Sequence, residues 1–333
     1  MHFGKLDAAE RDVLLQAAIL APSMHNTQPW KFRFHGTTVE VHRDPRYELP
    51  AEDPERRMVL IGTGAAMFNI RVAVAHLGFG TTVTMQAELD GTLAAELTVD
   101  AASAGDAALA DLFPFLARRR TNRGPYADRT VPIELREALV NAALAENAML
   151  EWVTDADRRR RLLSLTADAN LADATDPART AERRHWVGGS RDRDGVPSAS
   201  LGPRAIPLSA PVRDLGASRT DHSRDIGKFE AHPELAVLST LHDSPRDWLV
   251  AGQALERVLL VATANGLATS MLTQAVEHAD LRWLIRDPLS GWSEPQVVLR
   301  LGYGTEVPPT PRRPAAEFVE TDVAVTTQQD VDQ

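Results

Sequence analysis

The segment from Ala21 to Trp30 concentrates residue types that can recognise a polar heterocycle. Short hydroxyl and amide side chains, together with free backbone N–H groups, can meet the alternating acceptors and donors at the edge of such a ring. The alternative is a turn whose polar groups hydrogen-bond to one another, with Trp30 in the core. The candidate contact residues are Pro22, Ser23, Met24, Asn26 and Gln28.

A second polar cluster, residues 118–126, has the composition of an oxyanion receptor and follows an apolar helical pattern. Planar guanidinium groups grip phosphate through paired hydrogen bonds. A third basic group, Arg312 and Arg313, could complete the same receptor. The alternative is a solvated basic patch that compensates the C-terminus of the preceding helix. The candidate phosphate ligands are Arg119, Arg120, Thr121 and Arg123.

Other patterns that could do chemistry are weaker. The run Gly62–Ala66 is similar to a dinucleotide fingerprint, but it lies inside an apolar helical pattern and not between a strand and a helix. The ten histidines show no His-Glu-x-x-His or comparable spacing, so we expect no metal site. His25 lies inside the first cluster, where a structural role is the simpler interpretation. The basic run Arg158–Arg161 is typical of a solvated helix face.

Composition limits the class of protein. The 333 residues, 44% of them apolar, suffice for one large or two ordinary domains. A net charge of −10 argues against binding to a nucleic-acid backbone, so small molecules are the expected partners. The absence of cysteine excludes disulfides and thiolate nucleophiles. We see no secretory signal, and the uncharged stretch Val258–Val276 contains enough polar residues to predict a buried helix and turn, not a membrane span. These features predict a cytoplasmic protein.

The chain contains an internal repeat. Residues 14–19 resemble residues 139–144, at an offset of 125 residues. Gly64-x-Ala66 leads to Gly78 with the same spacing that joins Gly252-x-Ala254 to Gly266, at an offset of 188 residues. Each of these two segments predicts a long apolar helix ended by a left-handed glycine. Such helices belong in a core or at a subunit-like interface.

The difference between the two offsets, 63 residues, predicts an insertion between about Thr154 and Pro245. Its middle, 173–225, is rich in Arg, Asp, Gly, Ser and Pro and shows little apolar periodicity, which is typical of a functional lid or mobile loop. The alternative is a disordered surface insertion. Predicted strands, with helices between them, indicate the α+β class: 31–34, 38–42, 81–85, 96–99, 150–154, 235–239 and 296–301. We divide the chain into residues 1–105, residues 106–320 with the insertion at about 173–230, and a polar tail, 321–333.

These motifs resemble a known family. Pro22-Ser23-x-x-Asn26-x-Gln28-Pro29-Trp30 is similar to the signature loop of nitroreductases, and Arg119-Arg120-Thr121-x-Arg123 is similar to their phosphate motif. Residues 266–270, 296–304 and 312–313 also fall where that family would place them. The double repeat and the stretch Arg43–Arg57 resemble the Acg subgroup of flavin-binding proteins. The resemblance implies a nitroreductase-like fold in which two fused repeats form an intramolecular pseudo-dimer, with further dimerisation left open.

The resemblance also implies one FMN site per chain, because the two halves of the site are divided between the repeats. The first repeat has the signature loop but carries Leu6–Glu10 in place of an arginine-rich opening, and the second carries Glu146–Ala148 in place of the loop. By resemblance, Arg119, Arg120, Thr121 and Arg123 hold the phosphate and ribityl chain, and Arg312 or Arg313 closes over the phosphate. The signature loop contacts the flavin, and Thr273 and Gln274 lie near its N5 side.

Family chemistry is a two-electron shuttle that needs no catalytic side-chain nucleophile. NAD(P)H gives a hydride to the flavin, which passes it to a nitroaromatic, quinone or similar acceptor. The alternative is a non-catalytic FMN-binding or sequestering protein, in which the insertion folds over the flavin and shuts out substrates.

Overall fold

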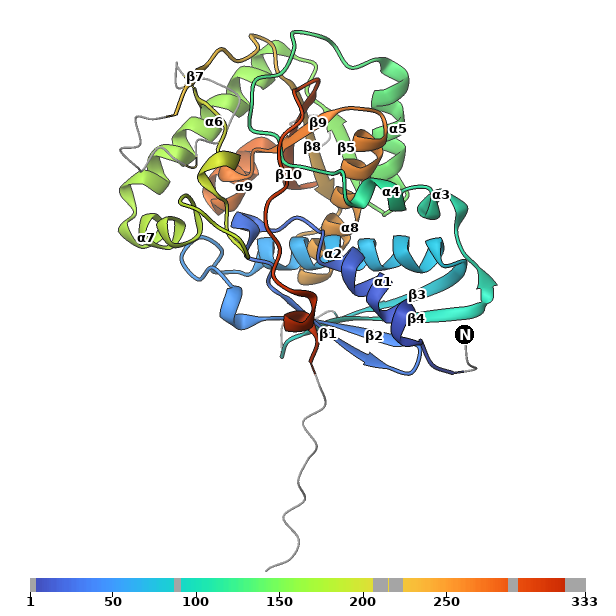
Figure 1. The fold of residues 1–333 in the computed structure, drawn as a ribbon. Coiled ribbons are helices and arrows are strands. Elements are labelled where there is room, and N and C mark those ends of the chain that lie inside the picture. Colours follow the sequence, from blue (N-terminus) through green and yellow to red (C-terminus); the bar gives the residue numbers. More distant parts are fainter. Residues whose placement is uncertain (1–3, 87–90, 206–214, 216–223, 287–292, 321–333) are drawn as a thin grey trace, which may run out of the picture.

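The computed structural model describes residues 4–86, 91–205, 215, 224–286 and 293–320 (Figure 1). Two four-stranded antiparallel sheets have the same topology. The first has the order β1 (Trp30–His35), β2 (Thr38–Arg43), β4 (Leu93–Ala104), β3 (Phe79–Met85). The second has the order β5 (Met149–Trp152), β8 (Glu234–Thr240), β10 (Glu294–Gly302), β9 (Ala268–Met271). Corresponding strands take corresponding places, so the chain is two fused repeats of one α+β fold, as the sequence predicted.

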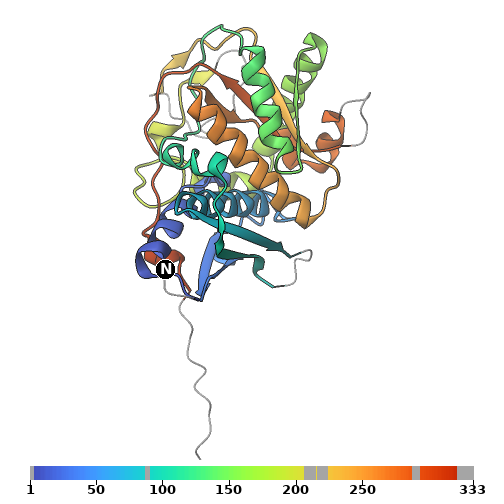
Figure 2. The ribbon, with the colours of Figure 1, turned by 90° about the vertical axis from the view of Figure 1, so that its right-hand side faces the viewer.

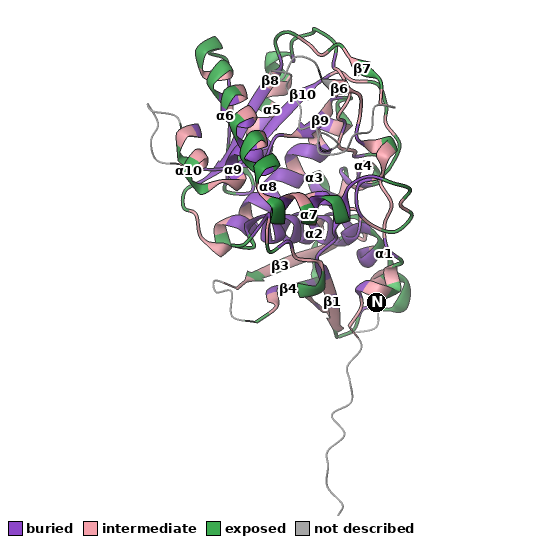
Figure 3. Cartoon of the chain, turned by 90° about the vertical axis from the view of Figure 1, so that its left-hand side faces the viewer, coloured by how far each residue is buried: buried purple, intermediate pink, exposed green. Residues whose placement is uncertain are grey.

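Two long helices pack against each other between the sheets (Figure 2). Helix α2 (Arg57–His76) belongs to the first repeat and α8 (Pro245–Ala264) to the second. Both end where the sequence predicted, since Gly78 and Gly266 have φ values of 87° and 72°. Helix α2 is long and apolar enough to span a membrane by composition alone, but 94% of its most apolar window is buried inside the fold (Figure 3). It is therefore the central core helix.

Two further helices occupy equivalent positions. Helix α1 (Ala8–Ala18) packs on α2, and α5 (Ile133–Leu144) packs on α8. Asp7 and Glu10 start α1 with a capping box, each side chain accepting a hydrogen bond from the other residue's backbone N–H. Two short helices, α3 (Ala107–Ala110) and α4 (Phe113–Leu116), connect the repeats. These positions match the repeated segments 14–19 and 139–144.

The insertion lies between β5 and β8, where the first repeat has only the turn Gly36–Thr37. It contains α6 (Ala156–Thr175), α7 (Pro177–Trp186) and the short strands β6 (Arg204–Ala205) and β7 (Ile226–Gly227). Helix α7 was not predicted, because its buried face consists of Arg179, Arg183 and Trp186 instead of a periodic apolar stripe. Residues 206–214 and 216–223 of the predicted lid lie outside the described residues.

The C-terminal segment crosses from the second repeat to the first. It leaves β10, runs in extended form past residues 21–30, and ends beside β1, where Val319 bridges Phe32 (Figure 1). This crossing brings Arg312 and Arg313 into contact with the loop that precedes β1. The helices α9 (Gln274–Glu277) and α10 (Ala279–Arg282) follow the strand β9. The strand β9 was not among the predicted strands. The predicted tail, 321–333, lies outside the described residues.

Candidate functional site

The ring loop, defined here as residues 21–30, has an unusual backbone. His25, Asn26 and Gln28 have φ values of 49°, 56° and 54°, in the left-handed region that non-glycine residues rarely adopt. Ser23 supports this path, because its Oγ accepts a hydrogen bond from the backbone N–H of Gln28 at 2.9 Å. Strained conformations of this kind persist where surrounding contacts fix them, and they cluster at binding sites.

Side chains of the ring loop are held from two directions. The Asn26 amide donates to the carbonyl of Gly195 in the insertion at 3.0 Å and to the carbonyl of Pro311 at 2.9 Å. Its Oδ1 accepts from Arg312 at 2.9 Å. The Gln28 amide donates to the carbonyl of Arg193 at 3.0 Å. The insertion and the C-terminal segment therefore both clamp the loop.

The arginine cluster is defined here as Arg119, Arg120, Arg123 and Arg312. The first three follow α4, and the pairing of Thr121 with Thr269 joins their segment to β9. Arg119 and Arg312 both donate to the carbonyl of Leu20, at 3.1 Å in each case. Because carbonyl groups at a helix C-terminus carry partial negative charge, the end of α1 attracts these guanidinium groups.

Two adjacent cavities join these parts. The larger, of about 300 Å³, is lined from the first repeat by Pro22, Ser23 and Asn26 and from the second by Thr121 and the arginine cluster. The smaller, of about 70 Å³, is mostly apolar. Its lining includes Met24, Met58, Ile61, Met271 and Thr273, together with Leu215 of the insertion. Only the larger cavity reaches the size usual for a ligand site.

Three predicted site residues do not line either cavity. The Gln28 side chain is fully buried, and its Oε1 accepts from the backbone N–H of Arg313. Arg313 lies over the Tyr47 ring, 3.5 Å from its centroid, beneath the ring loop. Gln274 donates to Asn170 of α6 at 3.3 Å. The ten other predicted residues line one cavity or both: Pro22, Ser23, Met24, Asn26, Arg119, Arg120, Thr121, Arg123, Thr273 and Arg312.

Glu256 of α8 lies behind the arginine cluster and was missed from the sequence. It is fully buried, and its Oε1 lies 3.4 Å from Arg119 Nε. Burial raises the pKa of Glu256 to about 7, against the opposing effects of Arg119, Asn69 and Arg312. Burial, together with repulsion from Arg119, lowers the pKa of Arg312 to about 9. The signal in the sequence is weak, because Glu256 is one of several polar residues in a largely apolar helix and stands beside Arg257.

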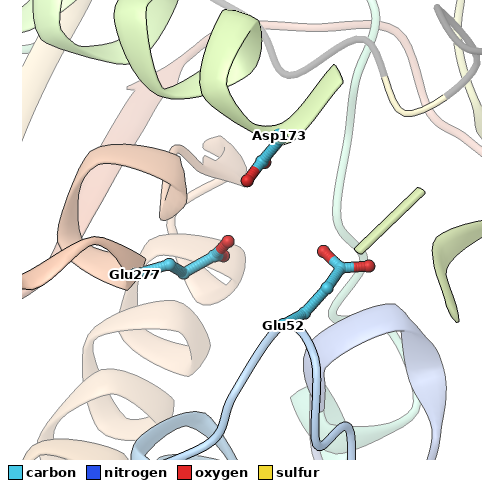
Figure 4. A group of neighbouring side chains, drawn as sticks. All are labelled: Glu52, Asp173 and Glu277. Carbon is cyan, nitrogen blue, oxygen red and sulfur yellow. The ribbon is translucent and has the colours of Figure 1, made fainter. Parts of the chain in front are cut away.

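A second buried network ties the ring loop to the insertion. The carboxylates of Glu52, Asp173 and Glu277 point toward one another (Figure 4), with oxygens within 4.8 Å. Arg183 donates to both Glu52 and Asp173 at 2.7 Å. Glu52 also contacts His25 at 2.9 Å. Asp173 is paired further with Arg179 and His278, so cationic and imidazole groups surround the acidic group.

Comparisons with known proteins identify the family. No protein-family model matches the chain. A Mycobacterium tuberculosis protein named as an NAD(P)H nitroreductase is 31% identical over 325 residues, covering 94% of this chain and 92% of that protein. A second relative from the same organism, named as the NAD(P)H nitroreductase acg, is 30% identical over 328 residues, covering 91% of this chain and 93% of that protein.

Solved nitroreductases resemble this chain at low sequence identity. A nitroreductase with bound FMN from Bacteroides fragilis has a TM-score of 0.36 and 17% identity, covering 67% of this chain and 99% of that one. One from Desulfitobacterium hafniense has a TM-score of 0.38 and 15% identity, covering 60% of this chain and 94% of that one. Similarity at this level adds nothing to the assignment, which rests on the two relatives. On their evidence, the chain belongs to the nitroreductase family and to its Acg-type subgroup.

Proposed function

We propose that the chain binds one FMN across its two repeats and acts as an NAD(P)H-dependent flavin oxidoreductase. One observation carries the proposal. Two polar clusters about 100 residues apart in sequence line a single cavity, with the ring loop on one side and the arginine cluster on the other. Two of the relatives carry the name NAD(P)H nitroreductase.

The residues present fit a phosphate-bearing flavin. Arg119 Nε is buried without a hydrogen-bond partner among the described residues, although its ion pair with Glu256 lies close by. The only hydrogen bond described for the Arg120 side chain goes to the carbonyl of Arg119, so donors remain for an anion. Arg120 would bind the phosphate directly, and Thr121 offers a hydroxyl in the same cavity. The donors of Arg312 and of the Asn26 amide are already paired within the protein, so Asn26 would shape the cavity while Arg119 and Arg312 add positive charge.

The apolar cavity beside the ring loop would take the edge of the ring. Pro22, Ser23 and Met24 would pack on one side, against Met58 and Ile61 of α2. When bound, FMN supplies the hydride chemistry that no side chain here offers. The protein orients the ring, anchors its phosphate and excludes water from the apolar side.

Turnover tests the proposal directly. Protein loaded with FMN should oxidise NADH or NADPH in the presence of menadione or a nitrofuran, followed at 340 nm. Flavin binding should appear as a yellow protein with quenched flavin fluorescence. A protein that stays colourless after incubation with FMN would refute the binding proposal, and a loaded protein without turnover would refute the oxidoreductase proposal.

A second candidate function is FMN binding without catalysis. Leu215 of the insertion is 4% exposed and lines the smaller, apolar cavity, called here the ring-side cavity. Carbonyl groups of Arg193 and Gly195 in the same insertion hold Gln28 and Asn26. These contacts favour a site in which the insertion covers the cavity proposed to hold the edge of the flavin ring. If the insertion controls access, its deletion should raise the turnover of loaded protein or make turnover appear.

A further inference from the structure

The carboxylate of Glu256 lies behind the arginine cluster without being part of the cavity wall. Neither of its oxygens accepts a hydrogen bond of good geometry from a described residue, and the Asn69 amide of α2 makes only a weak contact with it. Its close ionic contact is Arg119 Nε at 3.4 Å. A buried carboxylate that lacks ordinary hydrogen-bond partners is costly, so its charge must be matched to that of the surrounding groups.

Comparison of the two repeats shows that this carboxylate accompanies the arginine cluster. At the offset of 188 residues, Glu256 corresponds to Phe68 of α2. Phe68 is fully buried in the apolar core, on the repeat that lacks an arginine-rich opening. Packing between α2 and α8 therefore accepts an apolar side chain at this repeated position. The acidic residue Glu256 stands there in the repeat that also carries the arginine cluster.

The charges around Glu256 come from several elements. The segment after α4 supplies Arg119, and the C-terminal segment supplies Arg312. Helix α2 supplies Asn69, which does not titrate. On α8 itself, Arg257 is engaged elsewhere, with Glu146 at 2.8 Å. Arg120 acts on Arg312 and is itself attracted to Glu306, which lies in the C-terminal segment. Glu256 is therefore the anion that acts on Arg312 and pairs with Arg119, while Glu306 acts on Arg120.

We propose that Glu256 is a built-in counter-anion of the arginine cluster, which takes up a proton from solvent when a phosphate monoester binds in the cavity that Arg119 and Arg312 line. The inference rests on the proposed function, because it assumes that a phosphate-bearing flavin occupies the larger cavity. A phosphate dianion close to these arginines replaces the negative charge that the carboxylate provides in the free protein. The carboxylate then becomes a carboxylic acid, and the site gains one proton together with its ligand.

The direction follows from electrostatics. Burial already raises the pKa of Glu256 to about 7, while Arg119 and Arg312 favour its ionised form. A bound dianion cancels their attraction and adds a like charge, so the pKa rises further. At pH values between the pKa of Glu256 in the free protein and its pKa in the complex, the protein takes up protons when the ligand binds. The affinity for phosphate esters therefore falls as pH rises through this range.

Isothermal titration calorimetry of flavin-free protein with FMN, in buffers of different ionisation enthalpy, measures this uptake. At pH 8 the FMN phosphate, with a second pKa of about 6, is already a dianion and contributes little. We expect uptake of about half a proton to one proton per FMN. Riboflavin, which lacks the phosphate, should bind without uptake. Glu256→Gln should bind FMN without uptake, and Glu256→Asp should retain it.

The outcomes separate this inference from the proposed function. FMN binding without proton uptake by the unmodified protein overturns the inference and leaves the proposed function intact, as does equal uptake by Glu256→Gln. If FMN does not bind, the proposed function fails, and titration with inorganic phosphate decides the inference by the same measurement. Should Glu256→Gln fail to fold, the difference between FMN and riboflavin and the behaviour of Glu256→Asp decide it.

Discussion

Gly64 and Gly252 meet where α2 crosses α8, and each leaves room for the backbone of the other helix. A Cβ atom at Gly64 would lie 2.2 Å from the carbonyl oxygen of Leu249, and one at Gly252 would lie 2.0 Å from that of Ile61. Both pairs of equivalent residues are separated by 188 positions. The contact is therefore reciprocal, as at the two-fold axis of a homodimer, but it lies inside one chain.

Gly252→Ala should destabilise the protein by at least about 3 kcal/mol, because the added methyl group overlaps backbone and no side chain can move aside. The matched control is Gly266→Ala. That glycine has nothing within 4 Å of the added atom and only a left-handed φ, so the expected cost is about 1 kcal/mol. Urea unfolding followed by circular dichroism measures both. Equal costs would contradict the close crossing.

Arg120→Ala should weaken FMN binding by about tenfold to a hundredfold, since a charge-assisted hydrogen bond to phosphate is lost. The free energy of unfolding of this variant should barely change, because the only hydrogen bond described for the Arg120 side chain is to the carbonyl of Arg119. Arg118→Ala is the control, since Arg118 is exposed and stacks on Phe115. Fluorescence titration with FMN and riboflavin should show a loss for FMN alone. A similar loss for both variants would argue for long-range electrostatics.

Leu215→Ala should enlarge the ring-side cavity and increase the rate at which NADPH reduces the bound flavin, severalfold or more. The reason is that this side chain lines the cavity from the insertion. Leu201→Ala is the control, because Leu201 is buried in the same apolar cluster without lining either cavity. Stopped-flow absorbance at 450 nm follows the reduction. Equal rates in both variants would show that Leu215 does not limit access.

Arg183→Met should destabilise the protein by about 3–5 kcal/mol, because Glu52 and Asp173 then face each other with one cation fewer. The ring loop should also become less stable, because His25 of this loop contacts Glu52. Arg160→Met is the control, since Arg160 is 77% exposed and forms a surface ion pair worth at most about 1 kcal/mol. Hydrogen exchange should show faster exchange in α7 and the ring loop for Arg183→Met only. Unchanged exchange in the loop would disprove the coupling.

Asp53 should make the protein less stable as pH rises, which is the opposite of the effect of a carboxyl group whose pKa is lowered by folding. Burial raises the pKa of Asp53 to about 6, even though its carboxylate accepts from the N–H groups of Met58 and Val59 at the start of α2. The folded state thus holds a proton that the unfolded state has lost, and stability from this group falls as pH rises. The unfolding free energy of the unmodified protein minus that of Asp53→Asn should fall by about 2 kcal/mol between about pH 4 and 6.5. A rise would contradict it.

Local patterns in the sequence were enough to predict much of the fold. Residues 64–78 and 252–266 carry the same helix, ended by a glycine, in both repeats, because apolar periodicity and the left-handed preference of glycine are local properties. The resemblance of the ring loop and the arginine motif to the family also predicted that the two repeats share one flavin site, and this division remains a prediction. The roles of the individual ligands remain predictions.

Only the tertiary structure decided which charges meet. Helix α7 and the partners of Glu52 depend on buried ion pairs between segments over 100 residues apart, which leave no periodic signal in either segment. The pairing of Glu256 with Arg119 likewise requires α8 to lie beside the segment after α4. Periodicity records which face of an element is apolar. It does not record which distant polar group compensates a buried charge, because that depends on long-range packing.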